Sequence, residues 1–157
     1  EIIKQLYDVG RLFDRMQDID MVSQSFKAIA KVELGYRNLG NDIKQIYNDI
    51  RQTALNISTR GFIDKEKFSL LQKGIVNIKP FIYMDAYRIE DAIVDASKAA
   101  YLATLIESGG NDIERFNYAQ LADDLQINPV LTSKLNKLRI GLPEAYFYWA
   151  KTSRLIK

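Results

Sequence analysis

Apolar residues recur at every third or fourth position along most of the chain, which is the spacing of one face of an α-helix. In residues 1–17 this stripe comprises Ile2, Ile3, Leu6, Val9, Phe13 and Met16. In residues 21–34 it comprises Val22, Phe26, Ile29, Ala30 and Leu34. In residues 42–57 it comprises Ile43, Ile46, Tyr47, Ile50 and Leu55. These patterns predict three amphipathic helices joined by short loops.

Two more helices are expected before residue 108. Asp64 is a suitable N-cap for a short helix that would bury Phe68, Leu71 and Ile75. The longest helix is expected over residues 83–107, where many small side chains let a neighbouring helix approach closely: Ala92, Ala96, Ser97, Ala99, Ala100 and Ala103. Gly109 and Gly110 end it. Residues 1–107 therefore predict a helical bundle.

The residues from 117 to 140 predict two short helices separated by a turn. Asn117 is a good N-cap for the first helix, which contains Leu121-Ala122-Asp123-Asp124-Leu125. Ile127 is an apolar turn residue, and Asn128-Pro129 restarts the chain as N-cap and first helical residue. The second helix is expected over residues 130–140, with an apolar face made by Leu131, Leu135 and Leu138.

This order of residues resembles the helix-turn-helix of bacterial transcription regulators, over about 25 of the 157 residues. The resemblance implies that the second helix enters the major groove of DNA. The side chains that it would present to bases and phosphates are Val130, Thr132, Ser133, Lys134, Asn136 and Lys137. Basic residues that would hold the DNA backbone follow them: Arg139, Lys151 and Arg154. Gln126 departs from the pattern, because the turn position is usually glycine.

The segment after Pro143 allows two interpretations. Proline in the first turn, followed by Glu144 and Ala145, favours a helix. The aromatic run Tyr146-Phe147-Tyr148-Trp149 also suits a strand, and with Arg154 it would form a short β wing. We therefore predict an all-α fold: a bundle of about five to eight helices with a C-terminal helix-turn-helix-like segment, the wing being the alternative. Residues 1–107 are expected to form the bundle, and residues 112–157 a module packed on it.

The composition excludes several kinds of chemistry. The chain has no His and no Cys, so it lacks Ser-His-Asp triads, Cys nucleophiles and thiolate metal sites. Glu90, Asp91 and Asp95 lie close together on one expected helix, but a solvated helix face explains them better than a metal or acid–base site. We therefore expect no enzymatic activity, no cofactor, no metal and no small-molecule substrate.

Charge is uneven although the net charge is only +2. Residues 130–157 hold six Lys or Arg against Glu144 alone, directly after an acidic stretch. We therefore hypothesise a non-enzymatic DNA-binding or regulatory protein. The alternative is a helical interaction module, a subunit of a multiprotein assembly such as a secretion or phage complex, that binds no nucleic acid. DNA, a protein partner or further copies of the chain are the expected partners. The apolar runs are too short for a membrane span, and a cytoplasmic location is expected unless an upstream signal peptide has been removed.

Overall fold

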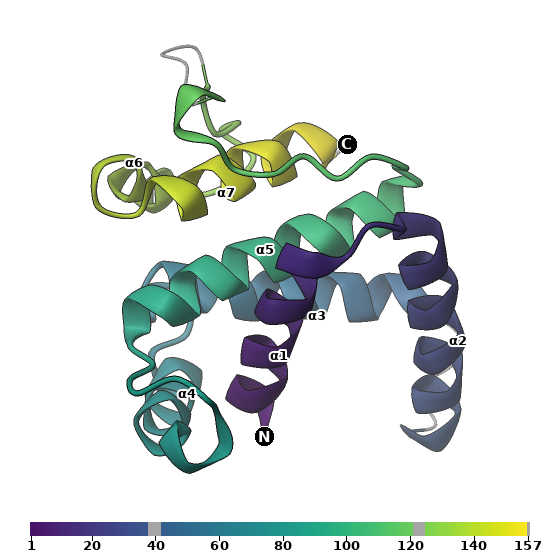
Figure 1. Ribbon diagram of the computed structural model, residues 1–157, viewed down its shortest axis with the longest axis horizontal. Helices are drawn as coiled ribbons and strands as arrows, with labels where there is room; N and C mark the ends of the chain where they lie inside the picture. The colour runs from purple at the N-terminus through teal and green to yellow at the C-terminus, as the bar shows by residue number, and fades with distance from the viewer. Residues whose placement is uncertain (38–41, 121–124, 157) are drawn as a thin grey trace.

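The computed structural model describes residues 1–37, 42–120 and 125–156, and within these ranges the chain is all-α. The described residues form seven α-helices and no strand. Figure 1 shows how these helices are arranged. The helices are α1 (Ile2–Arg15), α2 (Ile19–Arg37), α3 (Ile43–Ser58), α4 (Lys65–Asn77), α5 (Ile89–Ser108), α6 (Leu138–Gly141) and α7 (Pro143–Leu155). The prediction of an all-α fold with five to eight helices is confirmed.

Helix α5 is the centre of the fold and packs against α3, α7 and α1. In Figure 1 it lies between α7 on one side and α3 on the other, with α1 crossing it. Its small side chains allow this close packing, because Ala92, Ala96 and Ala100 have no exposed surface. The position expected for this helix was right, but its start was not. It begins at Ile89 rather than near Tyr83, because the Asp91 carboxylate accepts a hydrogen bond from the Arg88 N–H and caps the first turn.

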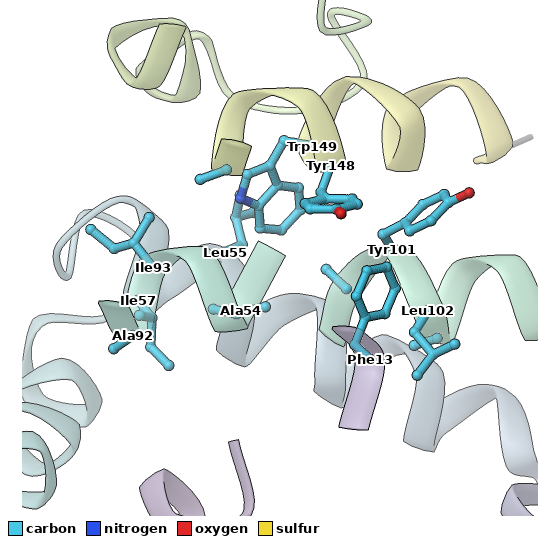
Figure 2. Close-up of a cluster of buried hydrophobic side chains, with 14 of the residues drawn as sticks. Phe13, Ala54, Leu55, Ile57, Ala92, Ile93, Tyr101, Leu102, Tyr148 and Trp149 are labelled. Carbon is cyan, nitrogen blue, oxygen red and sulfur yellow. The ribbon is translucent and has the colours of Figure 1, made fainter. Parts of the chain in front are cut away.

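Aromatic side chains from three helices fill the core between α1, α5 and α7. Figure 2 shows Phe13 of α1 beside Tyr101 of α5, with Tyr148 and Trp149 of α7 on the opposite side. The Phe13 and Tyr148 rings meet edge to face, with their centroids 5.1 Å apart. Trp149 also donates a hydrogen bond from Nε1 to Ser58 Oγ at 2.9 Å. This bond joins the C-terminal helix to the end of α3.

The C-terminal segment is a helix, and the alternative of a β wing is wrong. Pro143 occupies the first turn of α7, as expected for a residue without a backbone N–H. All four residues of the run Tyr146–Trp149 are buried, because α7 is covered on several sides. A run of four buried aromatic residues lacks the 3.6-residue period of an amphipathic helix, which is why the segment also suited a strand.

The segment expected to form a DNA-recognition helix has a different conformation. Pro129 and Val130 form a turn, residues Ser133–Lys137 form a 3₁₀ helix, and only Leu138–Gly141 are α-helical. The single α-helix expected over residues 130–140 is therefore wrong. In the segment expected as the first helix, Tyr118–Gln120 form one 3₁₀ turn, and Leu121, Ala122, Asp123 and Asp124 lie outside the described residues. The helix-turn-helix is thus not confirmed.

Helix α2 lies at one end of the bundle, and its main packing partner is α3 (Figure 1). The Phe26 ring stacks on Tyr47 of α3, with centroids 5.3 Å apart. Ile19, Ala30 and Leu34 are buried on the same inward side. Ile29, which the sequence assigned to this inward stripe, is instead 64% exposed. The division of the chain into parts 1–107 and 112–157 stays a prediction.

Candidate functional site

Five of the residues expected to contact DNA are exposed on the segment from 130 to 137: Val130, Ser133, Lys134, Asn136 and Lys137. Thr132 lies half-buried and caps the 3₁₀ helix, since its hydroxyl accepts a hydrogen bond from the Lys134 N–H. The Lys134 ammonium lies 4.8 Å from the centroid of the Phe62 ring. This contact ties the segment to the loop between α3 and α4.

The remaining three expected DNA contacts lie on α6 and α7. The half-buried Arg139 guanidinium lies over the Tyr146 ring and donates to the Leu125 carbonyl at 3.5 Å. The Lys151 ammonium pairs with the Glu114 carboxylate and lies 5.3 Å from the centroid of the Phe147 ring. Arg154 is exposed near the end of α7. Arg139 and Lys151 thus contact the chain's own aromatic residues, and both contribute to packing around α7.

The acidic residues singled out on the long helix divide between surface and interior. Glu90 forms an ion pair with Arg60, and this hydrogen bond lowers the pKa of the Glu90 carboxyl. Asp91 caps α5, as described above. Asp95 is fully buried, so the expectation of a solvated face is wrong for this residue. The sequence pattern missed it because the residues that enclose Asp95 come partly from α1, more than 80 positions away.

Two hydrogen bonds from other side chains hold the Asp95 carboxylate. Its carboxylate accepts from the Tyr87 hydroxyl at 2.8 Å and from Arg11 Nη2 at 3.0 Å. Burial raises the pKa of Asp95, while the Tyr87 and Arg11 bonds oppose that rise. Gly10 of α1 packs directly on the carboxylate, since a Cβ at this position would lie 2.1 Å from Asp95 Oδ1. Gly10 therefore covers the carboxylate on the side that faces α1.

A second buried charge follows one helical turn later on α5. Lys98 is only 3% exposed, and its ammonium pairs with Asp14 of α1 at 2.8 Å and with Glu144 of α7 at 3.0 Å. The two carboxylates come from helices on different sides of α5. These ion pairs join α1, α5 and α7, so we interpret Lys98 as a structural residue.

Hollows on the surface offer little catalytic chemistry. One of about 230 Å³ is lined by Gln126, Ile127, Asn136, Arg139 and Tyr146. Another of about 380 Å³ is lined by Ser69, Gln72, Lys73, Val76 and Asn77. No carboxylate is present among the described residues that line them, and the same part of the chain contains no cluster of three or more acidic ligands for a metal.

Large apolar side chains stand exposed along the outward face of α2. Met21 is 64%, Ile29 64%, Val32 56% and Tyr36 81% exposed. Their spacing keeps them on one side of the helix, opposite the residues that pack on α3. Smaller exposed residues fill the positions between them: Ser25, Ala28 and Gly35. We call these seven residues the α2 stripe.

Comparison of the chain with protein-family models, with curated proteins and with solved structures gives no match. Within the described ranges, no helix combines the length and apolar character needed to cross a bilayer.

Proposed function

We propose that this chain is a non-enzymatic helical interaction module that binds protein through the α2 stripe. The observation that carries the proposal is the line of exposed Met21, Ile29, Val32 and Tyr36 on the outward face of one helix. Single exposed apolar residues are ordinary on protein surfaces, whereas a contiguous apolar face is typical of a binding surface. Methionine and tyrosine are also enriched in the centres of protein interfaces.

The remainder of the helix supports this assignment. Helix α2 already buries Ile19, Ala30 and Leu34 and packs the partly buried Phe26 against the core, so the α2 stripe is a second apolar face. One apolar face is sufficient to hold an amphipathic helix on a bundle. The second face exposes apolar surface at a free-energy cost of about 25 cal/mol per Å² until a partner covers it.

Position-specific photo-crosslinking in the producing cells tests the proposal. A photo-crosslinking amino acid at position 32 on the α2 stripe is compared with one at position 70, where Leu70 is 69% exposed on α4. We expect discrete protein adducts from position 32, lost when Ile29→Glu is added, and none of comparable yield from position 70. Equal yields from both positions, or adducts that persist with Ile29→Glu, would overturn the proposal.

DNA binding by residues 130–137 is a second candidate function. The observation that favours it is the exposure of Ser133, Lys134, Asn136 and Lys137 within one 3₁₀ helix that Thr132 caps. Short polar and basic side chains of this kind contact phosphates and base edges in protein–DNA complexes. The contacts of Arg139 and Lys151 within the chain make the basic surface smaller than the sequence predicts.

A further inference from the structure

The α2 stripe has the shape needed to pair with itself. An antiparallel pair centred between Ala28 and Ile29 places Ile29 opposite Ala28 and Val32 opposite Ser25 of a second copy. Ile29 and Val32 then each face a small side chain, which is how two helical surfaces interdigitate. At each end Tyr36 faces Met21, a favourable contact between a thioether sulfur and an aromatic ring.

The charges along α2 also favour an antiparallel arrangement. The start of the helix carries Asp18 and Asp20, its middle carries Lys27, and its second half carries Lys31 and Arg37 against Glu33. Antiparallel copies bring the acidic start of one helix toward the basic half of the other, and their helix dipoles oppose each other favourably. A parallel pair would instead place like charges side by side.

The area of the α2 stripe matches a small, reversible interface. Residues 21–36 span roughly 22 Å of helix. The four large side chains expose roughly 300–400 Å² per copy at the fractions given above. Complete coverage of these side chains in both copies would bury roughly 700 Å², and the small and polar residues around them would add to this. Interfaces below about 1,200 Å² in total are generally weak and concentration-dependent.

From this complementarity we infer that the occupant of the α2 stripe is a second copy of this chain, paired through α2 in an antiparallel, two-fold symmetric contact. The inference rests on the proposed function, which requires only that some protein binds there. In such a contact Ile29 of one copy meets Ala28 of the other, and Ala28 of the first meets Ile29 of the second, so one surface supplies both sides.

Sedimentation velocity of the purified chain tests the pairing. Across the micromolar range the wild-type chain should convert from monomer to dimer as its concentration rises. Ile29→Glu with Val32→Glu should abolish the dimer, because unpaired carboxylates would be buried at the contact. Leu70→Glu on α4 is the matched control and should leave the dimer unchanged. A wild-type chain that stays monomeric overturns the inference. In that case a position-32 adduct containing another protein would still support the proposed function.

The absence of cysteine from the chain allows a clean test of orientation. An antiparallel pair brings the two copies of residue 28 together at the axis, so Ala28→Cys should form a disulfide-linked dimer under mild oxidation. Tyr36→Cys alone should not, but it should link to Met21→Cys when the two variants are mixed. Efficient self-linking of Tyr36→Cys would contradict the antiparallel arrangement. Circular dichroism and thermal melting of each variant check that it remains folded.

Discussion

Single residues in this bundle show that charge, as well as apolar packing, holds the helices together. Asp95 and Lys98 lie one turn apart on α5, and both are almost completely buried. Both form ion pairs with residues of other helices: Arg11 and Asp14 on α1, and Glu144 on α7. Removing one member of a buried pair leaves its partner unsatisfied, so such residues are sensitive to substitution.

Gly10 is the position where α1 approaches this network most closely. Gly10→Ala would place a methyl carbon 2.1 Å from Asp95 Oδ1, so the helix or the carboxylate must shift. We expect the free energy of unfolding to fall by about 1–3 kcal/mol, as for other overpacked cores. Chemical denaturation followed by circular dichroism measures this. Gly141→Ala is the control, because no atom lies within 4 Å of its added Cβ. Equal stability of the two variants would contradict the packing described here.

Asp95 should also give the stability a characteristic pH dependence. Because burial raises its pKa in the folded chain, the folded state binds this proton more tightly than the unfolded state. The stability contributed by Asp95 therefore falls as pH rises from its unfolded pKa, about 3.9, through its raised folded pKa. Asp95→Asn stays neutral, so its stability relative to the wild type should rise over that window. Denaturant titrations of both proteins at a series of pH values test this. If the stability of Asp95→Asn relative to the wild type fell as pH rises, the explanation would be refuted.

At the scale of secondary-structure elements, side chains from distant segments fix the helix ends. The Arg115 guanidinium donates to the backbone carbonyls of Phe13 and Met16 at the C-terminus of α1. It also lies 4.9 Å from the centroid of the Phe13 ring. These carbonyls have no partner within the helix, and a cation beside them also complements the helix dipole.

Arg115→Ala should therefore loosen the end of α1. We expect a loss of about 1.5–3 kcal/mol in unfolding free energy, the range for hydrogen bonds that involve a charged group. Arg154→Ala, an exposed arginine on α7, should change stability by less than about 0.5 kcal/mol. Denaturant unfolding of both variants measures these changes in stability. If Arg115→Ala were as stable as the wild type, a capping role for Arg115 would be excluded.

The segment 130–137 carries the prediction for DNA. If it binds DNA, Lys134→Ala with Lys137→Ala should weaken binding similarly on all sequences and flatten the dependence of affinity on salt. Fluorescence anisotropy at several salt concentrations measures both quantities. Lys65→Ala with Lys73→Ala, on the exposed surface of α4, is the matched control. If Lys134→Ala with Lys137→Ala left the affinity for DNA unchanged, residues 130–137 would not be a DNA contact.

How far the sequence predicts each element depends on how many apolar faces the element has. Helices α1 and α3 each have a single strong stripe, and their apolar spacing located them correctly. Helix α2 has two apolar faces, and periodicity cannot tell which one packs inward, so Ile29 was assigned to the wrong side. Leu135 and Leu138 are spaced by three, which suits a 3₁₀ turn as well as an α-helix. The apolar pattern therefore predicts one helix where the structure has a 3₁₀ helix followed by α6.

At the scale of the whole molecule, α5 organises the fold and α2 lies at its margin. Helices α1, α3 and α7 cover α5, and their aromatic and charged contacts with it are described above. Helix α2 adds its inward residues to α3 and leaves the α2 stripe exposed. The sequence contained the signal for this surface, since positions 21, 25, 28, 29, 32, 35 and 36 share one helical face. Recognising it as exposed required the packing of the other face on Tyr47.

Amide hydrogen exchange of α2 as a function of protein concentration tests the central claim most directly. If a second copy covers the α2 stripe, peptides from residues 21–36 should become more protected as concentration rises through the micromolar range. Peptides from α4 should not change, and Ile29→Glu should remove the effect. Protection of α2 that is independent of concentration, or that rises equally in α4, would contradict pairing through this helix.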